Sequence, residues 1–325
     1  MKKILLSIII PVYGVEAYLS RFLKSLEKNF QSEIELILVD DGNIDNCGRM
    51  IDEFTVKNTP DLSIVAVHKE NGGVSSARNA GLNIARGEYV WFVDPDDYLN
   101  NDSIKNILYV INSYNNLDMF IFNYYEELYS GKFFLHTIPG FTEGLIKKER
   151  LLDEFILDKY LLSHLCNKVL RRSLFNNVRF NEKINYMEDY ALLTDISINV
   201  EKIYYKPIVI YYYCYNNNSL SRKLSVEKLI RSFYIVKERY EKYTQILNKK
   251  MFNAPVINAM GLITLKYECD KEFDVDIFTE YINNNITEIL IDKRFKFQVK
   301  KRCFFVYIGI AKYYYFIKKK IKNLW

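Results

Sequence analysis

Three aspartates within four residues are the part of this sequence with the clearest capacity for chemistry. Asp94, Asp96 and Asp97 directly follow the apolar run 89–93, which has the pattern of a short buried strand. Carboxylates this close repel one another, so a cation normally accounts for such a cluster. Oxygen ligands at the carboxyl end of a strand suit Mg²⁺ or Mn²⁺. A solvated turn is the alternative, because Asp-Pro-Asp-Asp also favours turns.

Two other polar segments follow strand-like runs nearer the start of the chain. Asp41 comes just after the apolar run 34–39, and Asn71, Gly72 and Gly73 precede a helical pattern. Because open α/β sheets bind ligands at the carboxyl ends of their strands, Asp41 could accept a hydrogen bond from a uracil N–H. The glycines would expose backbone N–H groups to a phosphate or a ribose.

Pro11, Tyr13 and Arg78 complete the candidate nucleotide site. Pro11 and Tyr13 end the first apolar run, where a base or ribose could lie against the chain. Arg78 follows the glycines on the predicted helix, and it can pair with a pyrophosphate or with the acidic cluster. It can equally be a structural ion pair, so its role stays open. The segment is not a P-loop, because no Gly-Lys-Ser/Thr follows it.

Alternating strands and helices must position these residues. The apolar patterns predict an α/β fold with a mostly parallel sheet and right-handed crossovers. The expected strands cover 4–10, 35–39, 63–68, 89–93 and about 119–124, and the expected helices cover 15–30, 46–55, 76–85 and 103–112.

The order of these motifs resembles the family 2 inverting glycosyltransferases of the GT-A fold, which transfer a sugar from a nucleotide diphosphate sugar. The resemblance covers about the first two hundred residues. It implies a Rossmann-like central sheet flanked by helices, with a smaller helical carboxyl-terminal region. It also implies that Asp41 binds uracil and that Asp94 and Asp96 form the acid-x-acid pair, with Asp96 near ribose and metal. Asp97 is then the direct ligand of Mn²⁺ or Mg²⁺. Asn43 and Pro95 stand where the family usually has serine.

The same resemblance supplies the acceptor side of the site. Residues 165–169 look like the family's Trp-Asn-Lys segment, with Cys166 in place of the tryptophan. Glu188 and Asp189 match the Glu-Asp pair that begins a helix in the resembled enzymes. Inversion requires one carboxylate to take the proton of the acceptor hydroxyl, and Asp189 is the predicted base, with Glu188 as the alternative. A structural helix-dipole role would satisfy either residue as well.

Length and composition indicate more than one domain. The 325 residues predict a glycosyltransferase domain over 1–215, with a nucleotide half at about 1–125 and an acceptor half at about 126–215, and a helical domain over 216–325. Five scattered cysteines suit buried thiols in a reducing cytoplasm.

The positive charge is concentrated in the last 33 residues. Residues 293–325 contain eleven Lys and Arg and no acid, which leaves 1–292 with a net charge of −6 although the whole chain carries +5. Aromatic residues alternate with these cations, as in helices that lie in the interface of an anionic membrane. The apolar run 303–317 is too short to span a bilayer. We therefore expect a cytoplasmic protein attached peripherally to the inner face of the membrane, rather than to nucleic acid; a basic helix packed on the domain is the alternative.

The sequence as a whole predicts metal-dependent transfer of a sugar from a UDP-sugar to a saccharide or lipid-linked saccharide acceptor, in the synthesis of cell-surface polysaccharide such as capsule or lipopolysaccharide. A nucleotidyltransferase would carry a basic, Gly-rich signature in its first loop, where this chain has Pro-Val-Tyr-Gly-Val. A degenerate transferase that only binds partners is the other alternative. Oligomeric state is left open.

Overall fold

The computed structural model describes residues 3–59, 62–114, 116–157, 161–216, 225–247, 253–268, 272–292, 295–309, 311, 314 and 315. The chain divides into two compact units, residues 1–220 and residues 221–325. The sequence predicts the second domain from residue 216. That assignment of domains stays a prediction.

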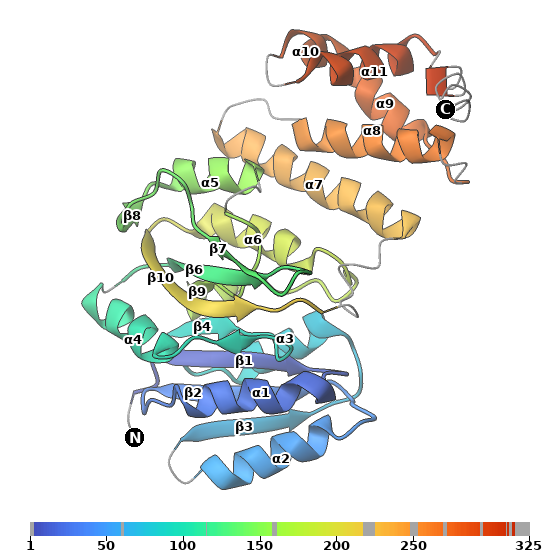
Figure 1. The fold of residues 1–325 in the computed structure, drawn as a ribbon. Coiled ribbons are helices and arrows are strands. Elements are labelled where there is room, and N and C mark those ends of the chain that lie inside the picture. Colours follow the sequence, from blue (N-terminus) through green and yellow to red (C-terminus); the bar gives the residue numbers. More distant parts are fainter. Residues whose placement is uncertain are drawn as a thin grey trace. The chain divides into compact units, whose positions relative to one another are not determined.

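A single mixed sheet organises the first unit (Figure 1). Its hydrogen-bonded order is β3-β2-β1-β4-β9-β6-β10-β5, with β7 beside β6 and β8 beside β10. The strands are β1 (Leu6–Val12), β2 (Ile34–Asp40), β3 (Ser63–His68), β4 (Tyr89–Phe92), β5 (Tyr98–Leu99), β6 (Met119–Glu127), β7 (Phe133–His136), β8 (Gly144–Ile146), β9 (Lys168–Arg171) and β10 (Ile203–Tyr213).

The direction of these strands brings the polar motifs to one edge of the sheet. β1 is parallel to β2 and β4, and β2 is parallel to β3. β9 is antiparallel to both β4 and β6, so β6 runs in the direction of β4, and β10 is parallel to β6. The carboxyl ends of β1, β2, β3, β4, β6 and β10 therefore lie along the same edge, where α/β sheets bind ligands.

Helices cover both faces of this sheet, which confirms the predicted α/β class (Figure 1). They are α1 (Glu16–Glu27), α2 (Cys47–Asn58), α3 (Val74–Ile84), α4 (Ser103–Ser113), α5 (Lys148–Leu157), a 3-10 turn at Arg172–Phe175 and α6 (Glu188–Asn199).

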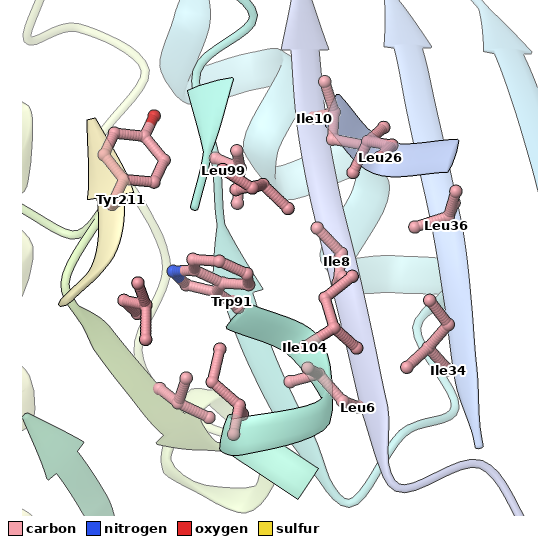
Figure 2. Close-up of a cluster of buried hydrophobic side chains, with 14 of the residues drawn as sticks. Leu6, Ile8, Ile10, Leu26, Ile34, Leu36, Trp91, Leu99, Ile104 and Tyr211 are labelled. Atoms are coloured by element: carbon pink, nitrogen blue, oxygen red, sulfur yellow. The ribbon is translucent and has the colours of Figure 1, made fainter. Parts of the chain in front are cut away.

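The core of the first unit forms on both sides of β1. Every residue of β1 is buried, as expected for a β-branched run in the centre of a parallel sheet. Ile8 and Ile10 face α1 and α4 together with Trp91 (Figure 2). On the other face, a Cβ added to Gly81 of α3 would lie 2.5 Å from the Ile9 side chain. Only glycine permits this approach, which fixes α3 closely against the sheet.

The second unit is helical and has its own hydrophobic cluster. It contains α7 (Val226–Leu247), α8 (Asn253–Glu268), α9 (Asp276–Asn284), α10 (Ile286–Ile291) and α11 (Phe297–Tyr307). Phe233, Ile263 and Ile282 are central members of the cluster, and Cys303 and Val306 of α11 belong to it. Among the described residues, no helix is both long enough and apolar enough to cross a membrane.

Candidate active site

The acidic loop after β4 is a tight turn whose three aspartates differ in burial. The backbone N–H of Asp97 donates to the carbonyl of Asp94, 3.2 Å away, which folds the loop back on itself. The side chain of Asp94 is one-third exposed, Asp96 is partly buried, and Asp97 is buried. The three carboxylates therefore do not share one environment.

Asp97 uses both carboxylate oxygens inside the protein. Its Oδ1 accepts the backbone N–H of Cys214 at 2.6 Å, and its Oδ2 accepts the Tyr211 hydroxyl at 2.7 Å. Burial, followed by the charges of Asp96 and Asp94, raises the pKa of Asp97 well above its ordinary value. These contacts attach the acidic loop to the end of β10. The direct metal-ligand role of Asp97 stays a prediction.

Asp94 and Asp96 each accept a hydrogen bond from a neighbouring side chain. Asp94 Oδ1 accepts from Arg78 at 2.9 Å and Asp96 Oδ2 accepts from the Asn216 amide at 3.0 Å. Each of these contacts engages one oxygen of its carboxylate. Burial and the neighbouring Asp94 raise the pKa of Asp96, so a cation would relieve an unfavourable charge.

No group of three metal-binding side chains occurs in the part of the chain that the structure describes. Mg²⁺ commonly binds through one or two carboxylates together with substrate phosphates. A pair of carboxylates such as Asp94 and Asp96 fits that mode of binding, in which a nucleotide diphosphate supplies the remaining ligands.

Arg78 joins three carboxylates from two separate parts of the fold. Its Nη1 lies 2.6 Å from Asp189 Oδ1 and 3.1 Å from Glu188 Oε1, and its Nη2 lies 2.9 Å from Asp94 Oδ1. The side chain is only 4% exposed. Burial alone would lower the pKa of Arg78, but the three negative charges outweigh burial and raise it. Of the roles left open by the sequence, pairing with the acidic cluster is the one observed.

Glu188 and Asp189 form the first turn of α6. Met187, just before the helix, has a left-handed φ of 61°, a strained conformation for this residue type. Burial raises the pKa of Asp189 to about 7; Arg78 opposes this shift, whereas Glu188 and Asp94 add to it. A carboxylate that titrates near neutral pH is well matched to general-base chemistry.

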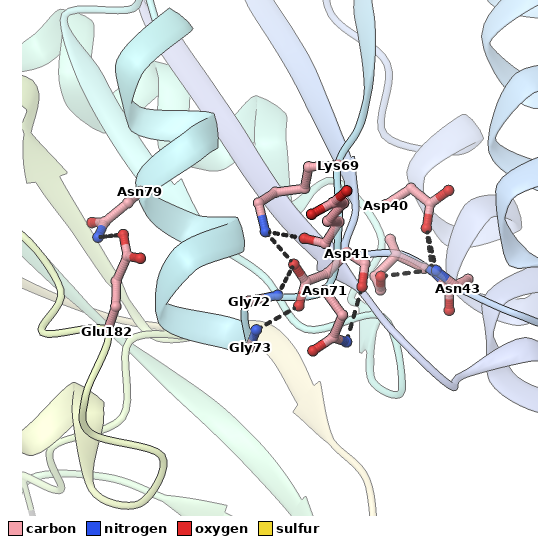
Figure 3. A network of polar contacts seen from close by, with 11 residues as sticks. Asp40, Asp41, Asn43, Lys69, Asn71, Gly72, Gly73, Asn79 and Glu182 are labelled. Atoms are coloured by element: carbon pink, nitrogen blue, oxygen red, sulfur yellow. Dashed lines mark hydrogen bonds and ion pairs between the residues drawn. The ribbon is translucent and has the colours of Figure 1, made fainter.

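Asp41 organises the loop that follows β3 (Figure 3). Its carboxylate accepts the backbone N–H groups of Gly72 and Gly73, at 3.1 and 2.8 Å, and pairs with Lys69 Nζ at 2.6 Å. Asn71 donates to the Asp41 carbonyl at 3.0 Å. The structure thus brings these predicted residues together, and it adds Lys69, which sequence reasoning missed. The uracil contact of Asp41 stays a prediction.

Asn43 connects the loops that follow β1 and β2. Its Oδ1 accepts from the Gly14 N–H and its Nδ2 donates to the Val12 carbonyl, both at 2.8 Å. A serine would have to make both contacts through a single, shorter-reaching oxygen, whereas the amide uses two separate atoms. Between these loops Tyr13 is 55% exposed, whereas Pro11 is buried in β1. Only Tyr13 therefore presents a surface to a ligand in this conformation.

The segment that resembles Trp-Asn-Lys is structural. The buried Lys168 ammonium donates to the carbonyls of Leu162 and His164, at 2.8 and 2.6 Å. The Cys166 carbonyl accepts the indole N–H of Trp91 at 2.7 Å. These bonds hold the loop before β9 beside the acidic cluster.

The chain belongs to glycosyl transferase family 2, whose profile matches residues 7–179. Glycosyltransferase GlyA of Streptococcus pneumoniae serotype 4 is 32% identical over 224 residues, which are 67% of this chain and 31% of GlyA. The minor teichoic acid biosynthesis protein GgaB of Bacillus subtilis is 33% identical over 61% of this chain and 21% of GgaB. This chain thus matches about a third and a fifth of those two relatives. Family membership sets aside the nucleotidyltransferase alternative.

Solved structures agree on the fold. Residues 1–349 of S. aureus TarS in complex with UDP superpose with a TM-score of 0.62 at 19% identity, covering 99% of this chain and 92% of that one. The complex of the same fragment with UDP-GlcNAc gives a TM-score of 0.65. The GT-A architecture expected from the sequence is therefore confirmed.

Proposed function

We propose that this protein transfers a sugar, with inversion, from a UDP-sugar to a saccharide or lipid-linked saccharide acceptor in the synthesis of a cell-surface polymer. Family membership and the TarS complexes with UDP and UDP-GlcNAc support the donor class. GgaB, named for teichoic acid biosynthesis, supports the acceptor class. The observation that carries the proposal is the Arg78 contact, because one guanidinium links the acidic loop to Asp189.

In the proposed reaction Asp189 accepts the proton of the acceptor hydroxyl. The acceptor oxygen forms a bond to the anomeric carbon as the bond from that carbon to the diphosphate oxygen breaks, and UDP leaves with the electron pair. Asp96 and Asp94 would hold a divalent ion, which supplies charge neutralisation to the diphosphate when bound. Asp41, Tyr13 and the Gly72-Gly73 loop would bind the nucleoside.

The test is a screen of nucleotide sugars with and without Mn²⁺. We expect a UDP-sugar to raise the melting temperature most, and to release UDP in the presence of a suitable acceptor. The anomeric configuration of the product, measured by NMR, checks the stereochemistry. A product that retains the configuration of the donor would contradict single displacement.

We also propose that α11 attaches the protein to an anionic membrane. Its described residues have two faces: Cys303 and Val306 pack in the core of the second unit, whereas Phe297, Phe304 and Tyr307 are exposed. Lys296 and Lys301 are exposed beside these rings. A face of rings and cations suits the membrane interface. Residues 293–294, 310, 312–313 and 316–325 of the basic tail lie outside the described residues.

A further inference from the structure

One face of α3 contacts the whole segment that leads to the proposed base. Ser75 Oγ donates to the Ile184 carbonyl at 3.3 Å. Asn79 exchanges two hydrogen bonds with the backbone of Phe180, at 2.9 and 3.1 Å. Its amide also donates to Glu182 at 2.9 Å (Figure 3). Arg78 and Asn79 lie three and four residues after Ser75, so all three side chains share one face of α3.

Arg78 is the charged member of that face, and its two terminal nitrogens contact different parts of the fold. Nη2 contacts Asp94 of the acidic loop, and Nη1 contacts the carboxylates of α6. The Phe180 ring covers the guanidinium at 5.3 Å, and Nε is buried without a partner in the described structure. A diphosphate could reach Arg78 only by displacing these carboxylates.

We infer that Arg78 is a positioning residue, which holds Asp189 in register with the acidic loop, and not a phosphate-binding group. The inference rests on the proposed function. A guanidinium is planar and fixes the directions of its N–H groups, so it sets the Asp189 and Asp94 oxygens relative to each other. An ammonium keeps the charge but loses this geometry. A displacement of about 1 Å at a reacting group can cost about 100-fold in rate.

The experiment compares Arg78→Lys with Arg49→Lys, a conservative change at an exposed arginine of α2. At saturating UDP-sugar, we expect kcat of Arg78→Lys to fall about 100-fold, with the Kd for UDP and Mn²⁺ within about threefold of wild type. Guanidinium chloride at tens of millimolar should restore part of the activity of Arg78→Ala. Arg49→Lys should match wild type. A Kd that weakens in parallel with kcat would overturn the inference, since Arg78 would then contact the nucleotide.

Hydrogen exchange of the peptide covering residues 180–190 gives a readout that needs no turnover. We expect faster exchange there in folded Arg78→Lys than in wild type, and unchanged exchange in α2. Exchange equal to wild type would overturn the positioning role even if no sugar were transferred. A wild-type protein that transfers no sugar would instead contradict the proposed function alone.

Discussion

Asp96 and Asp97 are adjacent but face different surroundings. The Asp97 carboxylate is buried and accepts hydrogen bonds from Cys214 and Tyr211. The Asp96 carboxylate is only partly buried and accepts from Asn216. We therefore expect Asp96→Asn to lower Mn²⁺-dependent transfer by orders of magnitude, because it removes a charged ligand. Asp97→Asn should lower the melting temperature instead, because its amide cannot accept from both donors.

Activity measured against Mn²⁺ concentration separates these two outcomes. The concentration for half-maximal activity should rise in Asp96→Asn and stay near wild type in Asp97→Asn. A large rise in the Asp97 variant would restore the ligand role that its sequence position suggests.

Asp189 should act in the chemical step alone. Asp189→Asn should lower kcat by about 10²–10⁴-fold while UDP affinity stays within a few-fold, as expected for loss of a general base. Because the pKa of Asp189 is raised to about 7, the carboxylate is protonated at acid pH and the wild-type rate should increase with pH through this range. Glu188→Gln is the matched comparison. If it abolishes transfer while Asp189→Asn does not, Glu188 is the base.

His68 bridges two carboxylates at the end of β3 and should make stability depend on pH. Its Nδ1 lies 2.8 Å from Asp40 and its Nε2 lies 3.0 Å from Asp52. The hydrogen bond to Asp40 raises the pKa of His68 above its ordinary value of 6.5. The stability that protonated His68 adds to the fold is therefore fully present below pH 6.5, and it is lost as the pH rises through the raised pKa. Burial alone would raise the pKa of Asp40, but hydrogen bonds from Asn43 and His68 outweigh burial and lower it below the ordinary value of 3.8. The stability that ionised Asp40 adds to the fold is therefore fully present above pH 3.8 and is lost in stronger acid.

The stabilising window therefore lies between about pH 4 and pH 6.5. His68→Gln should destabilise the fold by at most about 1 kcal/mol at pH 5.5, since the ring is half exposed and screened, and by less at pH 8.5. Urea unfolding at the two pH values measures the difference. An equal loss at both would mean that the charge on His68 contributes nothing.

At the scale of elements, the loops after β2 and β3 must approach closely to form the proposed nucleotide site. Gly42 has a φ of +72°, and a Cβ there would lie 2.6 Å from the Asn71 backbone nitrogen. Gly131, in the β6–β7 turn, has nearly the same φ of +73° with open space around it. Both alanine variants have the left-handed strain of about 1–2 kcal/mol, but only Gly42→Ala adds a steric clash.

We expect Gly42→Ala to be more destabilising than Gly131→Ala and to weaken UDP binding, because the Asp41 network moves with the loop. Thermal unfolding and calorimetry with UDP compare the two variants. Equal UDP affinity in both would show that the approach of these loops does not determine nucleotide binding.

The sequence predicted which segments form strands better than it predicted which strands pair with one another. The apolar runs of β1 to β4 were identified because period and burial are local properties. β9 was missed: it has four residues, two of them charged, and it is a strand because β4 and β6 pair with it.

For the candidate site, too, the sequence predicted local features but not the contacts between distant residues. Spacing indicated the acidic cluster, but it could not reveal that Asp97 is buried under Tyr211, a residue 114 positions away. Likewise, the contact of Arg78 with Asp189 joins residues 111 positions apart. Such pairings are tertiary, and a single sequence carries no local signal for them.

At the scale of the whole molecule, the family profile and the proposed chemistry lie in the first unit, while the positive charge lies in the second. Separation of charge from the site suits a protein that uses one surface for attachment and another for reaction. Deleting the tail from Lys293 would not test this cleanly, because it removes Cys303 and Val306 from the core of the second unit.

Exposed residues of α11, together with Lys296 just before it, allow a sharper test of membrane attachment. Each lysine near an anionic bilayer contributes about 1 kcal/mol, so Lys296→Glu with Lys301→Glu should weaken binding to phosphatidylserine vesicles by more than tenfold. Phe297→Ser with Phe304→Ser should weaken it independently of salt, because it removes apolar burial. The control is Lys28→Glu with Lys105→Glu, which changes the net charge equally at exposed positions of the first unit. Equal sedimentation of the charge variant and its control, or binding that ignores lipid charge, would mean that α11 serves only to pack the second unit.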